Sequence, residues 1–288
     1  MSSSETPAPR PALDEPNHLR RFLTIWIVAT LISLPLVIFL LGPDLPPGHA
    51  SEQASGHVTD NTVLLAMATP VLLLVVIYLL YAIFSFRQPA GGTLEAPAVR
   101  GHAGLQTVWI VATSAAVLAL AVYGTVRLLT DSGAGSGSGP KPLTVPKGNK
   151  LPVQVIAQQW AFTYRYPTYG GVETTHLELP VNQTVELHVT SLDVIHSFWA
   201  YQLGVKADAN PDVDNVAFVK PTKIETFELR CAELCGIWHG AMFDHGHVVS
   251  RPDFERWIHE QQLIFAPATK ALPKYSKTYA PEPTRRGE

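Results

Sequence analysis

The chain has 288 residues, of which 47% are hydrophobic, with a mean hydropathy of +0.13 and a formal net charge of -3. This weakly acidic balance shows no basic footprint, so nucleic acid is not an expected partner. Two cysteines are too few for a disulfide-rich scaffold and allow either one bridge or one metal site.

Three long apolar runs occupy the first half of the chain, at residues 22–42, 63–86 and 104–129. A bilayer core needs about 20 apolar residues of helix, so each run is long enough to span it. None of them contains Asp, Glu or Lys, and Arg127 lies at the end of the third, where it can reach the interface. The sequence therefore predicts a first transmembrane helix over 22–42 and a transmembrane hairpin over 63–129, and lipid is an expected partner.

The charges between these runs predict the orientation of the chain. The loop at 43–62 has no Lys or Arg, whereas basic residues precede the first run and occupy the loop at 87–103. Positive charge marks the cytoplasmic side, so residues 1–21 form a cytoplasmic tail and everything after the third helix is extracytoplasmic. The first run has a second interpretation, a signal peptide cleaved near Gly48-His49-Ala50. Both interpretations place the rest of the chain on the same side.

The character of the chain changes after the third run. Residues 130–145 are rich in Gly, Ser and Pro and form a linker. Residues 146–265 show short alternating apolar and polar segments separated by turn residues, which predict a β-sandwich or barrel. Residues 252–264 indicate a closing helix, and residues 266–288 form a C-terminal tail. The predicted fold class is a membrane-anchored α+β chain whose second part is all-β.

The segment CAELCGIWHGAM, residues 231–242, contains both cysteines of the chain. Cys231, Cys235, His239 and Met242 are soft donors that suit copper or zinc. Structural zinc sites use Cys and His without Met, and a mononuclear blue-copper site leaves one cysteine unused. A binuclear copper site uses both thiolates and needs a second histidine, which His196 in HSFW supplies after a strand-like segment. A simple disulfide is the alternative.

The pattern C-x-E-x-C-G-x-x-H-x-x-M, preceded by HSFW, resembles subunit II of haem-copper cytochrome c oxidases over about residues 60–260. The resemblance includes Gln159-Trp160, Asp193 and the stretch 204–208. It implies a cupredoxin-like barrel with a binuclear CuA centre, in which Cys231 and Cys235 bridge two coppers. It also implies that His196 and His239 are terminal ligands, one on each copper. Met242 would be the weak ligand of one copper, and the backbone carbonyl of Glu233 that of the other. The Glu233 carboxylate would bind a magnesium ion.

The same resemblance implies that the chain relays electrons in a bacterial plasma membrane. Electrons from cytochrome c would enter at Trp160 and pass through CuA to haem in subunit I, where oxygen is reduced to water with proton pumping. An exposed aromatic ring among acids suits a basic partner, and the candidate acids are Glu173, Glu178, Asp193 and Asp208.

Some features depart from the family or allow other functions. Gln106 stands where many members carry a Glu at the mouth of a proton path, so that role is in doubt. No C-x-x-C-H motif is present, so the electron donor is a separate protein. His245 and His247 are interpreted as surface or structural residues. Alternative functions are a CuA-bearing subunit of nitric oxide reductase, the CuA domain of nitrous oxide reductase, a metal-free quinol oxidase subunit, or a membrane-anchored module that delivers copper.

Overall fold

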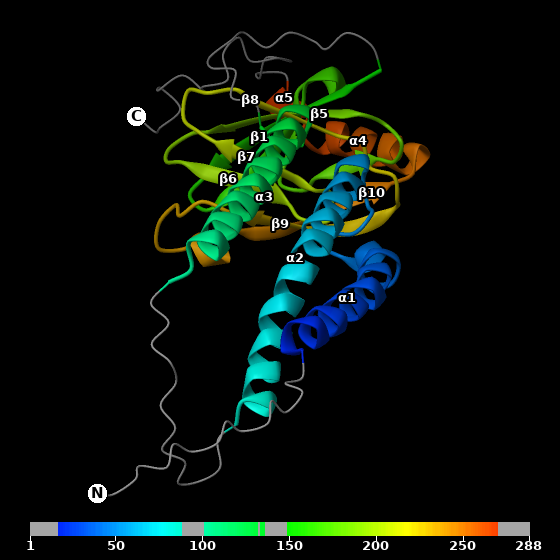
Figure 1. Ribbon diagram of the computed structural model, residues 1–288. Helices are drawn as coiled ribbons and strands as arrows, with labels where there is room; N and C mark the ends of the chain where they lie inside the picture. The colour runs from blue at the N-terminus through cyan, green and yellow to red at the C-terminus, as the bar shows by residue number, and fades with distance from the viewer. Residues whose placement is uncertain (1–16, 88–100, 132, 136–148, 270–288) are drawn as a thin grey trace, which may run out of the picture. The chain divides into compact units, whose positions relative to one another are not determined.

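The computed structural model describes residues 17–87, 101–131, 133–135 and 149–269 (Figure 1). Most of the predicted linker at 130–145 lies outside this range, as do residues 1–16 of the predicted tail and 270–288. The chain divides into two compact units, Met1–Gly42 with Thr62–Pro97 and Pro43–Asn61 with Ala98–Glu288. Its helices are α1 (His18–Leu36), α2 (Glu52–Ser85), α3 (Ala103–Thr130), α4 (Arg251–Ile264) and α5 (Ala266–Thr269).

Within the described part of the chain, three helices are long and apolar enough to cross a bilayer: His18–Asp44, Glu52–Ser85 and Ala103–Thr130. The first consists of α1, a π-helical turn at Val37–Leu41 and a 3-10 turn at Gly42–Asp44. It begins at the N-cap Asn17, whose side chain accepts a hydrogen bond from the backbone N–H of Arg20 at 3.0 Å. The many exposed Leu, Ile and Val side chains of these helices suit contact with lipid.

Helix α2 begins at Glu52, inside residues 43–62, which the sequence predicted to be a loop. Ser51 explains this start, because its Oγ accepts a hydrogen bond from the N–H of Ala54 at 2.9 Å. The same hydroxyl donates to the carbonyl of Leu203 at 2.6 Å, and the side chain of Gln53 accepts from the N–H of Lys220 at 3.0 Å. The first turns of α2 therefore belong to the same unit as the β domain.

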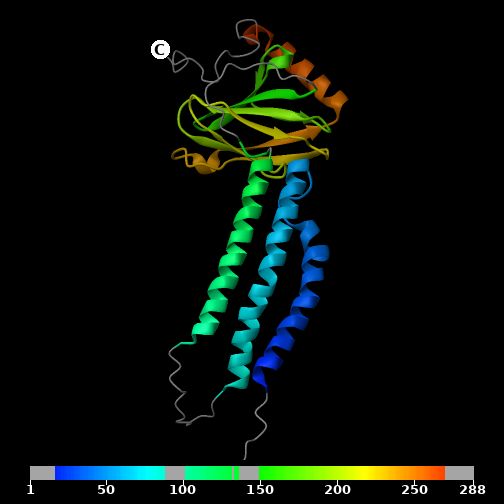
Figure 2. The same ribbon diagram turned by 45° about the horizontal axis from the view of Figure 1, so that its top comes forward.

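The β domain consists of two five-stranded sheets, in the orders β3-β2-β1-β5-β8 and β4-β10-β9-β6-β7. The pairs β1–β5 and β4–β10 are parallel, and all other pairs are antiparallel. Figure 2 shows the strands as stacked layers. The strands are β1 (Leu151–Gln158), β2 (Ala161–Tyr166), β3 (Val172–Thr174), β4 (Glu178–Pro180), β5 (Val185–Ser191), β6 (His196–Ala200), β7 (Val205–Ala209), β8 (Asn215–Val219), β9 (Glu225–Cys231) and β10 (Phe243–Val249).

The core of the β domain comes from the alternation that the sequence shows. Val153 and Val155 of β1 and Phe227 and Leu229 of β9 are fully buried, because alternate residues of each strand point into the space between the layers. The closing helix α4 is capped by Ser250, whose Oγ accepts from the N–H of Asp253 at 3.3 Å. It buries Phe254 and Ile258, as predicted for a helix near 252–264.

Candidate metal centre

The ends of two neighbouring strands position the centre. His196 is the first residue of β6, and Cys231 is the last residue of β9. These strands are antiparallel partners in which Phe198 lies opposite Cys231, so both donors fall at the same end of the sheet. The loop that follows β9 carries Cys235 and His239 and returns to β10 just after Met242.

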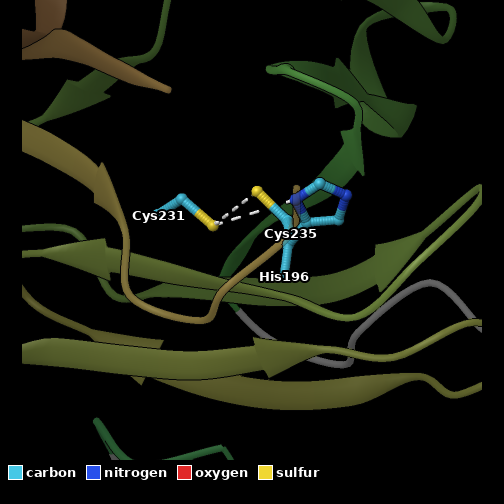
Figure 3. Close-up of side chains that lie close together, drawn as sticks. All are labelled: His196, Cys231 and Cys235. Atoms are coloured by element: carbon cyan, nitrogen blue, oxygen red, sulfur yellow. Dashed lines mark hydrogen bonds between the residues drawn. The ribbon is translucent and has the colours of Figure 1, made fainter. Parts of the chain in front are cut away.

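The predicted donors lie close together in this arrangement. The sulfurs of Cys231 and Cys235 are 3.8 Å apart and point toward each other beside the imidazole of His196 (Figure 3). Cys231 Sγ lies 3.8 Å from Nδ1 of His196, and Cys235 Sγ lies 3.5 Å from Nδ1 of His239. Met242 Sδ lies 3.8 Å from Cys235 Sγ, and the carbonyl oxygen of Glu233 lies 3.2 Å from Cys231 Sγ.

The two thiols are free and buried, so the disulfide alternative does not describe this structure. A disulfide needs a sulfur separation of about 2.05 Å, well below the 3.8 Å between these atoms. Among the residues that the structure describes, the grouping of potential metal-ligating side chains is His196, Cys231 and Cys235. His196, Cys235 and Met242 are almost inaccessible to solvent, whereas His239 is partly exposed.

The surroundings give the two thiols opposite acidities. Burial raises the pKa of the Cys231 thiol, but hydrogen bonds from His196 and from the backbone of Ser197 outweigh it and lower the pKa to about 6. Burial and the neighbouring Cys231 raise the pKa of Cys235 to about 11. One thiolate is therefore already favoured at neutral pH, and thiolate is the form that binds a metal.

Asp193 holds His196 in place, a role that the sequence analysis did not assign to it. Its Oδ1 accepts from Nε2 of His196 at 2.9 Å, and the N–H groups of Gln159 and Val194 bond to the same carboxylate at 2.7 and 2.6 Å. Burial raises the pKa of Asp193, but these hydrogen bonds lower it by more, so the pKa lies below its usual value. A carboxylate that accepts from one ring nitrogen directs the other nitrogen toward the cluster. The D-x-x-H spacing was the available signal.

Trp160 lies against the loop that carries the thiols. Its Nε1 donates to the carbonyl of Cys235 at 3.2 Å, and Nε2 of Gln159 donates to the same oxygen at 2.8 Å. Gly236 follows with a φ of +119°, and a Cβ there would lie 3.3 Å from the indole of Trp160. The ring is partly exposed and packs on the core of the domain. Trp160 therefore connects the protein surface to the backbone of Cys235, one of the two thiol-bearing residues.

Other candidate residues lie apart from the cluster or are already engaged. The Glu233 side chain is exposed, while Asp208 accepts from Ser197 at 2.8 Å and from Lys206 at 3.2 Å. Burial raises the pKa of Glu178 to about 7, so this carboxyl is only partly ionised at neutral pH. Of the remaining candidate residues, Glu173 lies on β3, and His245 and His247 lie on the outward face of β10. Gln106 lies in the first turn of α3.

Comparisons with known proteins show which proteins the chain is similar to. The family described as "Cytochrome C oxidase subunit II, periplasmic domain" matches residues 173–245. The chain is 29% identical to cytochrome c oxidase subunit 2 of Thermostichus vulcanus, covering 84% of this chain and 86% of that one. It is 28% identical to cytochrome c oxidase subunit 2 of Bacillus subtilis, covering 85% and 71%.

A solved structure, the periplasmic domain of subunit II of cytochrome oxidase of Bradyrhizobium japonicum, has 31% sequence identity and a TM-score of 0.40, covering 42% of this chain and 99% of that one. The fold class predicted from the sequence, helices long and apolar enough to span a membrane followed by an all-β domain, is confirmed.

Proposed function

We propose that the chain belongs to the cytochrome c oxidase subunit II family, to which its sequence is similar, and that it is the subunit through which electrons enter a respiratory oxidase. In this proposal cytochrome c is the donor, and haem in subunit I is the acceptor. Subunit I uses the electrons to reduce oxygen to water, coupled to proton pumping. The single observation that carries the proposal is the buried pair of thiols, each with its own imidazole, beneath a partly exposed tryptophan.

The donor set fits a binuclear copper centre, the cofactor expected in this copper-binding family. Two sulfurs lie at the middle, and each has an imidazole nitrogen within 3.8 Å. Each also has one weak donor, the Glu233 carbonyl beside Cys231 and the Met242 thioether beside Cys235. Thiolates, imidazoles and a thioether are the ligands that copper prefers. When bound, a copper pair here supplies reversible one-electron transfer.

The protein's own residues perform the rest of the task. Burial of His196, Cys235 and Met242 keeps water away from the centre, which limits reorganisation when the charge changes. Asp193 fixes the orientation of His196 through its 2.9 Å hydrogen bond. Trp160 donates a hydrogen bond to the Cys235 carbonyl, so its ring offers the electron-donating cytochrome a contact close to the Cys235 thiol. The exposed carboxylate of Glu233 is proposed to bind magnesium at the boundary with subunit I.

Burial of the donors also separates relay from copper delivery. A delivery protein must hand its ion to a partner, which requires exposed ligands, whereas His196 is fully buried and Cys235 nearly so. Three helices of the described residues are long and apolar enough to anchor the chain in a membrane. We propose the bacterial plasma membrane, with the β domain on the extracytoplasmic side, as the distribution of basic residues favours.

The test is to purify the chain with its oxidase partner and to measure copper content, the EPR spectrum and oxygen consumption with reduced cytochrome c. We expect two coppers per chain that share one unpaired electron, and consumption of oxygen by the complex. We expect this consumption to be lost in Cys231→Ser. One copper with a mononuclear spectrum would contradict the binuclear centre. Nitric oxide consumption in place of oxygen consumption would favour the nitric oxide reductase alternative.

A further inference from the structure

A pair of histidines outside the thiol centre lies on one face of β10. His245 and His247 are two residues apart in this strand, so their side chains point to the same side, the outward face of the second sheet. Gly246 between them faces the opposite way and is buried against the ring of Phe227. His245 is exposed, and His247 is partly exposed. Both imidazoles are therefore presented to solvent by a strand whose other face is fixed in the core.

The spacing of the two histidines suits chelation of a single ion. Residues two apart on a strand are separated by roughly 6.7 Å along it, because of the rise per residue. An imidazole nitrogen binds zinc at about 2.0–2.1 Å, so two rings that lean toward each other can share one ion. Strand β10 pairs with β9 on one side and with β4 on the other. The sheet therefore holds the pair at a chelating separation before any ion binds.

The neighbouring strand β9 orients one of the two rings. Thr226 lies opposite His247 in the antiparallel register, and its Oγ1 is 2.9 Å from Nδ1 of that ring. Histidine ligands commonly donate their second ring N–H to an oxygen of this kind, which leaves the lone pair of the other nitrogen for the metal. In His247 the engaged nitrogen is Nδ1, so Nε2 is the nitrogen that is available to an ion.

The strand on the other side of β10 supplies a carboxylate. Glu178 of β4 lies opposite His247 in the parallel register, so the two side chains are on the same face of the sheet. Glu178 is partly buried, and among the residues that the structure describes its carboxylate forms no ion pair and no hydrogen bond. Glu228, which lies opposite His245, is instead paired with Arg230 at 2.8 Å. A partly buried carboxylate without a partner is stabilised by a nearby cation, so Glu178 favours an ion at this place.

Two imidazoles and one carboxylate form a ligand set that zinc and copper(II) accept, with a further position left for water. We propose that His245, His247 and Glu178 form a second metal site, on the outward face of β10, which binds a divalent transition-metal ion of the zinc and copper(II) class. Thr226 is a positioning residue of this site, because it acts through Nδ1 of His247. The site shares no donor with the thiol centre, and the proposal does not depend on the oxidase function.

The test measures Zn²⁺ binding to the full chain in detergent, purified through a tag that contains no histidine. Cys231 and Cys235 are replaced by serine in every sample, so the thiol centre does not compete and the result is independent of the copper assignment. A chromophoric zinc chelator in competition gives the affinity. His245→Asn and His247→Asn are each expected to weaken Zn²⁺ binding at least about tenfold. The matched control is His259→Asn, which removes an exposed imidazole from α4 and is expected to match the parent.

The other two members of the site have variants of their own. Glu178→Gln is expected to weaken Zn²⁺ binding several-fold, because the amide lacks the charge of the carboxylate. Thr226→Val is expected to weaken it about tenfold, and Thr226→Ser, which keeps the hydroxyl, is expected to restore it. Equal Zn²⁺ affinity in Thr226→Val and the parent would show that the hydroxyl does not position the ring.

Two further measurements locate the ion and separate binding from folding. Zn²⁺ is expected to raise the thermal midpoint of the parent but not that of His247→Asn, and the metal-free midpoints are expected to agree. Bound Zn²⁺ is also expected to protect His245 and His247 from acylation by diethyl pyrocarbonate, read by mass spectrometry, while His259 stays reactive. The protection experiment uses the parent chain, so it decides the question even if a variant unfolds. Unchanged affinity in both histidine variants, or no protection of the pair, would overturn the proposal.

Discussion

Replacing Asp193 by alanine is the most direct test of how the centre is built. The carboxylate accepts a 2.9 Å hydrogen bond from Nε2 of His196, a ring that is fully buried. Three other groups donate to it. The N–H groups of Gln159 and Val194 lie on exposed residues and can bond to water instead, and the hydroxyl of Ser191 can bond to the carbonyl of Val194. The cost of the change therefore falls mainly on the imidazole, which loses its bond and its fixed orientation.

The magnitude follows from two independent considerations. A buried polar group left without its partner costs about 1–3 kcal/mol. Loss of a residue that orients a metal ligand typically lowers metal affinity by about 10–100-fold, or about 1.4–2.7 kcal/mol. Asp193→Ala is thus expected to weaken copper binding by that factor. Asp193→Asn, which retains an acceptor oxygen, is expected to lie between Ala and the wild type.

The assay is a competition titration of the detergent-solubilised chain against a chromophoric copper chelator. Asp208→Ala is the matched control, because its carboxylate bonds to Ser197 and Lys206 and touches no metal donor. If Asp193→Ala binds copper within about threefold of the control and gives an unchanged spectrum, the carboxylate does not orient His196 and the reasoning fails.

Three other changes probe the scaffold and the path of electrons. Gly246→Ala places a Cβ in steric overlap with the ring of buried Phe227, so the thermal midpoint should fall by the equivalent of about 1–3 kcal/mol; an unchanged midpoint would show that the ring can move aside. Burial raises the pKa of Glu178 from 4.5 to about 7, so the folded state binds its proton more tightly and stability falls as pH rises between these values. Glu178→Gln should remove that fall, about 1 kcal/mol after allowance for partial exposure, in thermal unfolding from pH 4 to 8; parallel curves for both proteins would refute it. Trp160→Phe keeps a ring but loses the bond to the Cys235 carbonyl, so reduction by cytochrome c should slow several-fold while a small-molecule reductant works at the wild-type rate.

The donors could be read from the sequence because most of them lie within one twelve-residue segment. Spacing there indicates metal-binding chemistry, and His196 was predicted as a further donor because it follows a strand-like segment, where a sheet can present a ligand. The hydrogen bond from His196 to Asp193 and those from Trp160 and Gln159 to the Cys235 carbonyl join residues far apart in the chain or depend on side-chain direction. Such contacts follow from the packing of the strands, which local patterns do not contain.

The membrane helices show the same division between local and long-range information. Their apolar runs were visible by length and composition, but the start of α2 at Glu52 was not. That start depends on Ser51 bonding both to Ala54 and to the distant Leu203 carbonyl. The parallel pairing of β1 with β5 is likewise a tertiary choice, since each strand's alternation is compatible with several neighbours.

Strand β6 connects the candidate metal centre to the end of its own unit where α3 and the first turns of α2 join the β domain. One end carries His196, and the turn at its other end is held by Ser51, which bonds to Leu203, and by Ala134, which pairs with Lys206. The two chain segments that join this domain to α2 and α3 therefore both bond to the β6–β7 hairpin, about 16 Å along the strand from His196. Strand β6 is short and is hydrogen-bonded to β7 and β9, so it is expected to be rigid. Within this unit, a displacement of the segments that hold the hairpin should move the centre without changing its internal distances, and hence should leave its redox properties unaltered.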